Sequence, residues 1–174
     1  MKFCFITVCL FWAGIGAPTM AATTLKLNQK INLLMVDGQK ISGSLLKGAD
    51  SLELSNGQHQ LLFNVVDTTD DKTGVPTSYF PSTFIATFST EHITSVSFKL
   101  PSLQTRQERR RFAAHPQYQL FDEKNQLIPV RTDSFVIADD ERCDLEQKMA
   151  EYNAAAKGAA VARFALTLAE PATW

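Results

Sequence analysis

The clearest structural signal in the chain is the stretch INLLMVDGQKI, residues 31–41. Apolar residues recur at every second position from residue 31 to 35, the period of two that is typical of a β-strand. The pair Asp37-Gly38 follows directly and favours a two-residue type I′ turn, because both central residues of that turn need φ > 0. The stretch therefore predicts a β-hairpin whose return strand begins at Ile41.

The same pattern recurs downstream. The segment SLEL, residues 51–54, alternates again, and the pair Asn56-Gly57 predicts a second tight turn. Residues 58–66 then continue as a strand with apolar side chains at every second position. Two hairpins in close succession make this half of the chain all-β.

Two further strands are expected at residues 83–90 and 93–100, where aromatic and aliphatic residues again alternate with polar ones. The linker around Glu91-His92 is short enough for the two to form an antiparallel pair. The predicted fold class is accordingly mainly β, made of antiparallel, sandwich-like hairpins.

Two helices complete the expected architecture and make it α+β overall. Residues 104–114 predict a short mid-chain helix that ends before Pro116, because the residue preceding a proline avoids the α region. A C-terminal helical segment is expected at residues 140–169, with an acidic start that suits the helix dipole. Its apolar face has helical spacing and consists of Leu145, Met149, Tyr152 and Ala156.

Short strands and one long loop account for the remaining segments. Residues 118–121 and 127–131 are expected to form two strands around a turn, with a further strand at 134–138. Residues 67–82 are the longest irregular stretch. Loops of that length in a compact domain are either mobile or functional.

The first 22 residues resemble a secretory signal peptide. Lys2 precedes an apolar run of about 15 residues, which is shorter than the roughly 20 that span a bilayer, and small residues follow it. We expect cleavage within residues 21–23, export to the periplasm, and one β-rich domain over residues 23–174 without a membrane span.

Charge and cysteine content exclude several classes of protein. The chain carries 17 basic and 18 acidic residues, a balance that argues against a nucleic-acid binder. Cys4 and Cys9 leave with the leader, so Cys143 has no partner for an internal disulfide. Acidic neighbours disfavour its thiolate, and it reads as an incidental thiol.

No motif for chemistry emerges from the sequence. The three histidines His59, His92 and His115 lack metal-ligand spacing, and His59 is expected at a strand edge beside a turn. Neither a nucleophile elbow nor a phosphate-binding glycine loop occurs. The expectation is a protein that is not an enzyme, with no catalytic residue, metal or cofactor.

Candidate partner contacts come from two places. Arg106, Arg109 and Arg110 share one face of the mid-chain helix and could hold carboxylates, although a solvated helix face is the simpler interpretation. Tyr79 and Phe80 lie among prolines in the long loop and are the aromatic residues most expected to be exposed.

Several segments are similar to a family of exported gammaproteobacterial proteins that includes the curli synthesis inhibitor. The similarity is densest over residues 23–66 and returns near the C-terminus. It rests on Val36-Asp37-Gly38, residues 44–54, Gly57-Gln58-His59-Gln60-Leu61 and Tyr152-Asn153-Ala154-Ala155-Ala156-Lys157. The resemblance implies a small extracytoplasmic β-domain and supplies no catalytic or binding residues.

The resemblance also implies a function, which is restraint of amyloid fibre assembly by a periplasmic interaction protein whose partner is a secreted amyloid-forming subunit. A β-domain can do this by pairing with an aggregating strand. The alternative is a cell-envelope module that binds a glycan or small ligand in a cleft under residues 67–82. A hydrolase ranks third, because nothing assembles a nucleophile with a base.

Overall fold

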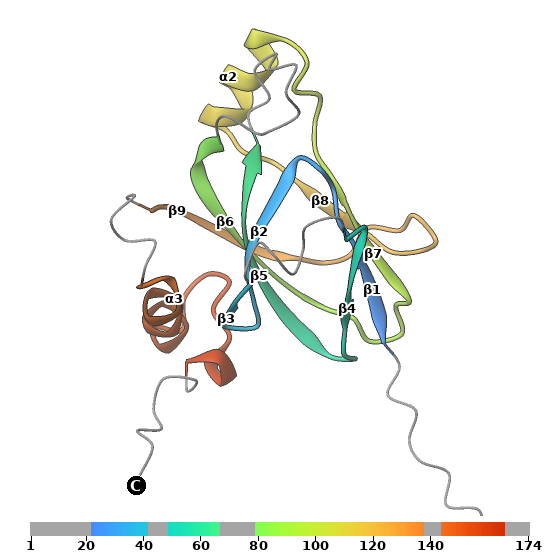
Figure 1. The fold of residues 1–174 in the computed structure, drawn as a ribbon, viewed down its shortest axis with the longest axis vertical. Coiled ribbons are helices and arrows are strands. Elements are labelled where there is room, and N and C mark those ends of the chain that lie inside the picture. Colours follow the sequence, from blue (N-terminus) through green and yellow to red (C-terminus); the bar gives the residue numbers. More distant parts are fainter. Residues whose placement is uncertain (1–21, 42–48, 67–78, 138–143, 166–174) are drawn as a thin grey trace, which may run out of the picture.

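A computed structural model describes residues 22–41, 49–66, 79–137 and 144–165 of the 174-residue chain. Within these residues the chain forms two β-sheets and two α-helices, and a short 3-10 helix follows the second (Figure 1). The elements are β1 (Thr23–Lys26), β2 (Ile31–Val36), β3 (Gln39–Lys40), β4 (Ser51–Leu54), β5 (Gln58–Val66), β6 (Tyr79–Ser89), β7 (Ser95–Lys99), α2 (Arg106–Ala114), β8 (Gln119–Phe121), β9 (Arg131–Val136), α3 (Leu145–Ala154) and η2 (Ala162–Phe164). The mainly β, α+β architecture is confirmed.

The strands are divided between two sheets. One sheet has the order β4-β1-β7-β8 and the other the order β3-β2-β5-β6-β9. Every ladder between the described strands is antiparallel except that of β1 with β7, which is parallel. The strands β3 and β4 therefore each lie at the edge of a sheet, and they follow one another in the chain.

The main hydrophobic core lies between the two sheets. Leu61, Phe63 and Val65 point into it from β5, as their alternation predicts. The ring of Phe63 meets those of Phe98 and Tyr118 edge-on, with centroids 5.0 and 5.1 Å apart. Such edge-to-face contacts add to the free energy gained by burying the rings.

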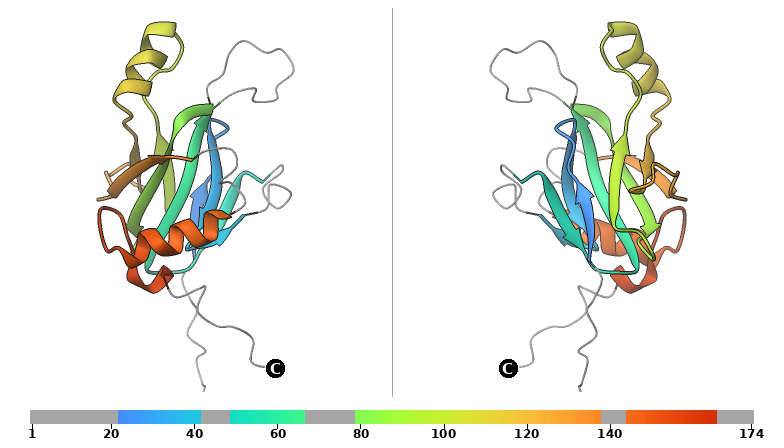
Figure 2. Two further views of the ribbon diagram at one scale, coloured as in Figure 1. Left: turned by 90° about the vertical axis from the view of Figure 1, so that its left-hand side faces the viewer. Right: turned by 90° about the vertical axis from the view of Figure 1, so that its right-hand side faces the viewer.

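The two helices cover different parts of this core. Thr105 begins α2 with a capping box, in which its side chain accepts from the backbone N–H of Glu108 and the Glu108 carboxylate accepts from the backbone N–H of Thr105. Phe112 then packs against the ring of Phe80. The helix α3 lies across the outer face of the five-stranded sheet (Figure 2), where Met149 belongs to a second apolar cluster with residues of β2, β5 and β6.

The first predicted hairpin is confirmed, with one correction. Asp37 and Gly38 have φ values of 52° and 79°, the left-handed pair that a type I′ turn needs. The return strand β3 pairs with Met35 and Val36 and ends at Lys40. The prediction that it begins at Ile41 is wrong, because a two-residue turn already brings residues 39 and 40 opposite β2.

Two other predicted hairpins are wrong. The strands on either side of Asn56-Gly57 do not pair, because β4 joins β1 while β5 joins β2 and β6. The same holds at Glu91-His92, since β6 and β7 belong to different sheets. At both places the chain crosses from one sheet to the other. Of the first pair only Gly57 has a positive φ, of 132°.

Several predicted boundaries also move. The strand expected at 127–131 is wrong, because Leu127 forms only an isolated bridge with Phe121 and residues 128–130 are not in a strand. The strand expected at 134–138 is found as β9, which begins earlier, at Arg131. The helix α3 ends at Ala154, because Ala156 and Gly158 take left-handed φ values of 52° and 54°. Ala156 is exposed and does not extend the apolar face.

Parts of other predictions lie outside the described residues. These parts are the leader, most of the 67–82 loop, Cys143, and both ends of the 140–169 helical segment. Residues 79–82, expected to close the loop, instead open β6.

Candidate functional site

The turn at the tip of the β2–β3 hairpin is fastened to β5 through Asp37. The backbone N–H of Asp37 donates to the carbonyl of Gln60 at 2.8 Å. In return, the Asp37 carboxylate accepts from the Gln60 N–H through Oδ1 at 2.8 Å and from the His59 ring through Oδ2 at 2.7 Å. Three hydrogen bonds therefore fix this edge of the five-stranded sheet.

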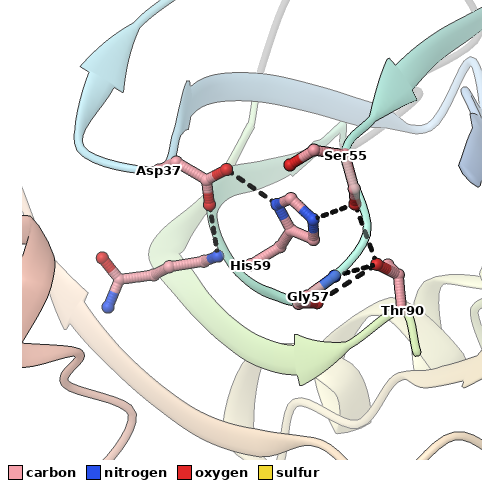
Figure 3. A network of polar contacts seen from close by, with 6 residues as sticks. Asp37, Ser55, Gly57, His59 and Thr90 are labelled. Atoms are coloured by element: carbon pink, nitrogen blue, oxygen red, sulfur yellow. Dashed lines mark hydrogen bonds and ion pairs between the residues drawn. The ribbon is translucent and has the colours of Figure 1, made fainter. Parts of the chain in front are cut away.

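His59 lies inside the protein with a hydrogen-bond acceptor at each ring nitrogen. The residue is only 2% exposed. Its Nδ1 lies 2.7 Å from a carboxylate oxygen of Asp37 and its Nε2 lies 2.7 Å from the carbonyl oxygen of Ser55 (Figure 3). The carboxylate and the carbonyl are both satisfied when both ring nitrogens carry a proton, so this geometry favours the imidazolium form of His59.

The protonation of His59 has a physical cause in its surroundings. Burial is the strongest influence on the ring and by itself lowers the pKa of His59. The hydrogen bonds to Asp37 and Ser55, together with the Asp37 charge, outweigh burial and raise the pKa above its ordinary 6.5. With both nitrogens engaged, the ring is suited to holding two segments together and not to acting as a general base.

Thr90 completes the network at the point where the chain crosses between the sheets. Its hydroxyl lies 3.0 Å from the Ser55 carbonyl and 3.1 Å from that of Gly57, and it accepts from the Gly57 N–H at 3.1 Å. Its own N–H donates to the Gly57 carbonyl at 2.8 Å. The crossover after β4 is thereby joined to the end of β6 (Figure 3).

A cavity of about 580 Å³ opens beside His59, between the edges of the two sheets. Its walls are hairpin residues 36–37 and 39–41 on one side and residues 49 and 51–55, mostly β4, on the other. We call this space the β3–β4 groove. It is therefore bordered by an edge strand of each sheet.

The outer side of β4 faces this groove with backbone polar groups. The N–H of Leu27 donates to the backbone carbonyl of Asp50 at 3.0 Å, so this carbonyl points toward β1. By the alternation of an antiparallel ladder, Ser51 and Glu53 direct their N–H and C=O groups away from β1. Ser55 continues this series, and its carbonyl meets His59. Among the described strands, β4 pairs with β1 alone.

A second buried network connects the groove to α3. The side-chain amides of Gln60 and Asn153 exchange two hydrogen bonds, at 2.8 and 2.9 Å. The Asn153 Oδ1 also accepts from the N–H of Val161, and the Ala159 carbonyl accepts from Gln60 and Thr87. Because Gln60 also donates to Asp37, the hairpin turn, β5 and α3 form one connected polar structure.

The predicted arginine cluster lies away from the groove. Arg106 and Arg110 are exposed on α2, and none of the three arginines lines the groove. Arg109 donates to the carbonyls of Leu103 and Gln104, which precede the helix. The structure thus gives Arg109 a role inside the fold, while the prediction of a partner contact on this face stays a prediction.

The expected exposure of Phe80 is wrong. Its side chain is 5% exposed, and its ring lies 4.8 Å from that of Phe112, centroid to centroid. The reason is that β6 begins earlier than the proline-rich sequence suggests, so Phe80 already points into the core. Tyr79 begins the same strand and pairs with Val66, and its side chain lies outside the described residues.

The central residues of the site were not predicted from the sequence. His59 was expected at a strand edge, whereas its ring is buried. Asp37 was expected only to form a turn, and no role was expected for Gln60 or Asn153. The signal that could have found them is the set of segments with the family resemblance, VDG, GQHQL and YNAAAK, because the structure brings these three segments together.

Two kinds of feature are absent from the described part of the chain. No group of three or more His, Cys, Asp or Glu residues there could hold a metal ion. Nor does that part contain a helix with the length and apolar character needed to cross a bilayer.

Comparison with known proteins finds a family that spans nearly the whole chain. Residues 24–173 match the family described as "Uncharacterized protein conserved in bacteria (DUF2057)". The chain therefore belongs to this uncharacterised bacterial family, while the link to the curli synthesis inhibitor stays a prediction.

Individual relatives agree with the family match. The "UPF0319 protein YccT" of Escherichia fergusonii is 40% identical over 156 residues, which is 89% of this chain and 71% of that protein. The proteins of the same name from Shigella flexneri serotype 5b and Escherichia coli (strain K12 / DH10B) are each 39% identical over 153 residues, 87% of this chain and 70% of theirs. No solved structure matches the chain.

Proposed function

Because the chain belongs to the DUF2057 family of bacterial proteins, we propose that it is a non-enzymatic periplasmic protein that restrains the assembly of curli-type amyloid fibres. It does so by holding an extended segment of a secreted subunit in the β3–β4 groove. The observation that carries the proposal is the outer side of β4, which points backbone groups into a cavity between two sheet edges.

A strand edge presents N–H and C=O groups that pair readily with another extended chain. Main-chain hydrogen bonds of this kind give affinity, and pockets for alternate side chains give selectivity. A subunit segment paired with β4 cannot pair with the end of a growing fibre, so its capture slows growth.

The groove also limits what can bind. The described edges are short, because β3 has two residues and β4 has four. Short edges discourage open-ended pairing between copies of the protein. Lys40, Asp37 and Glu53 place both signs of charge around the groove, so extended shape contributes more to recognition than net charge. Capture of single segments predicts that near-equal amounts of protein and subunit are needed.

The test is a pair of variants at Glu53, whose N–H points away from β1. Glu53→Pro removes that N–H without removing a ladder bond to β1, since proline is tolerated where a strand N–H faces outward. Glu53→Ala removes the same carboxylate and keeps the N–H. Dye-monitored fibre growth of a secreted amyloid subunit should slow with the wild-type protein and with Glu53→Ala, and slow several-fold less with Glu53→Pro.

Two outcomes would contradict the proposal. If the growth curves with an equimolar amount of this protein overlay those of the subunit alone, restraint of fibre assembly is not its function. Equal inhibition by Glu53→Pro and Glu53→Ala, with both variants folded by circular dichroism, would show that β4 is not the pairing edge. Ser51→Pro, on the same side of the strand, serves as the replacement if Glu53→Pro does not fold.

The alternative function is a cell-envelope module that binds a glycan or small ligand. The volume of the β3–β4 groove favours this alternative, because about 580 Å³ lies within the range of small-molecule sites. Binding of envelope glycan fragments, with resonance shifts confined to residues 36–41 and 51–55, would support this alternative over strand capture.

A further inference from the structure

A second cavity lies on the outer face of the five-stranded sheet, beside the start of α3. It has a volume of about 230 Å³ and is lined by Leu34, Lys40, Asn64, Thr83, Ile137 and Leu145. Asn64 is only 5% exposed, and its side-chain oxygen Oδ1 has no hydrogen-bond partner. A buried acceptor without a donor is rare in folded proteins, because its lost hydration is not replaced.

The other β5 side chains on the same face as Asn64 do not have an unpaired buried polar atom. Side chains alternate along β5, so Gln60, Leu62 and Asn64 share the outer face. Gln60 has its amide fully engaged with Asn153, and Leu62 is buried in the apolar cluster beneath α3. Asn64 is the member of this row with a buried polar atom that the protein leaves unsatisfied.

We propose that this cavity binds a small neutral amide with a branched aliphatic group. The ligand donates its N–H to Asn64 Oδ1. Its carbonyl accepts from the Asn64 side-chain amide or from the hydroxyl of Thr83, which lies directly opposite Asn64 in the ladder. Its aliphatic group lies against the apolar lining residues Leu34, Ile137 and Leu145.

The size and charge of the cavity support this class of ligand. A volume of about 230 Å³ is several times the roughly 30 Å³ that one water occupies, and one side of the cavity is apolar. Lys40 contributes a positive charge to the lining, and the Glu146 carboxylate accepts from the backbone N–H of Lys40 at 3.0 Å. These two opposite charges near the cavity favour a neutral ligand.

This site is separate from the β3–β4 groove. Lys40 is the one residue that lines both cavities among the described residues. Glu53→Pro should therefore leave amide binding unchanged, which keeps the two proposals independent of one another.

The test compares two molecules of the same shape. Isovaleramide carries the N–H donor, and isobutyl methyl ketone replaces its NH₂ group with a methyl group. Each is titrated into the isotope-labelled protein and followed by NMR. We expect saturable shifts at Asn64, Thr83 and Leu145 with the amide, and affinity roughly two- to tenfold weaker with the ketone, the value of one hydrogen bond.

Variants at two asparagines complete the test. Asn64→Leu removes the unsatisfied oxygen and should abolish the preference for the amide over the ketone. Asn32→Leu is the matched control, because Asn32 lies opposite Asn64 on β2 but does not line the cavity. Absence of shifts with the amide, equal affinity for the ketone, or an unchanged preference in Asn64→Leu would each overturn the proposal. If Asn64→Leu fails to fold, the comparison of amide and ketone affinity for the wild-type protein still tests the proposal.

Discussion

At the scale of single residues, His59 links protonation to the geometry of the groove. The ring is buried, its two acceptors favour the charged form, and it joins the hairpin turn at Asp37 to the crossover at Ser55. Loss of one proton would leave one of these two acceptors without a donor. The position of the groove walls relative to each other thus depends on a titratable group.

This leads to a prediction about stability and pH. The pKa of His59 is raised in the folded protein above 6.5, so its contribution is fully present below pH 6.5 and is lost as the pH rises through the folded-state pKa. His59→Asn should cost about 2–3 kcal/mol at pH 6 by urea unfolding, because it removes two charge-assisted hydrogen bonds. The cost should become smaller toward pH 8.5.

Thr90→Val is the control for this measurement. It weakens the same junction by removing the hydroxyl that contacts Ser55 and Gly57, and it involves no titratable group. Its cost, about 1 kcal/mol, should not vary with pH. A cost of His59→Asn that stays constant or grows as the pH rises would contradict the assignment of the imidazolium.

A second prediction at this scale concerns Gly57. Its φ of 132° is one that side-chain-bearing residues rarely adopt, although a Cβ there would meet no atom within 4 Å. Gly57→Ala should therefore cost on the order of 1 kcal/mol or more through backbone strain alone. Thermal unfolding measures this, and an unchanged melting temperature would show that the crossover has a different conformation in solution.

At the scale of elements, the sequence predicted strands better than it predicted their partners. Alternation located β2 and β5 and the face of β5 that enters the core. It could not show that β4 and β5 belong to different sheets, because a glycine turn looks alike in a hairpin and in a crossover. Pairing depends on contacts between segments distant in the chain, such as β1 with β7, and local patterns carry no information about them.

The same limit applies to the site. The turn at Asp37-Gly38 was predictable from two adjacent residues. The meeting of Asp37 with His59, and of Gln60 with Asn153, depends on the packing of segments 22 and 93 residues apart. Aromatic character alone was misleading at Phe80, because a strand start within a proline-containing segment buried the ring.

The attachment of α3 gives a prediction for an element. Asn153→Leu would leave the side-chain oxygen of Gln60 and the Val161 N–H without partners in a buried region. The Gln60 NH₂ group would keep its bond to the Ala159 carbonyl. We expect a loss of about 3 kcal/mol in the free energy of unfolding, measured by urea unfolding. Glu151→Ala, at an exposed position of the same helix, should change it by less than about 0.5 kcal/mol. Similar costs for the two variants would contradict the role of this network.

The arginine face of α2 gives another prediction. Arg106 and Arg110 are exposed, so a contact with acidic groups of a subunit would be screened by salt. Replacing both by Ala should weaken fibre inhibition modestly at low ionic strength and have no effect at high ionic strength. Equal inhibition by wild type and the double variant at both salt concentrations would show that these arginines do not contact the subunit.

At the scale of the whole molecule, two sheets enclose one main core (Figure 1), and the β3–β4 groove is bordered by one edge strand of each sheet. The buried networks around Asp37, His59 and Gln60 hold one wall of this groove, and the backbone of β4 forms the other. The molecule thus combines a fixed frame with a short strand edge, as capture of a single extended segment requires.

The most direct test of this account is hydrogen exchange at the backbone N–H groups of Ser51 and Glu53, measured with and without a secreted amyloid subunit. Strand capture predicts that both amides exchange more slowly in the complex, because each gains a hydrogen-bond acceptor from the captured segment. The amides of Leu52 and Leu54, which point toward β1, should change much less. Unchanged exchange at Ser51 and Glu53 in a complex that forms, or protection confined to residues 106–114, would contradict it.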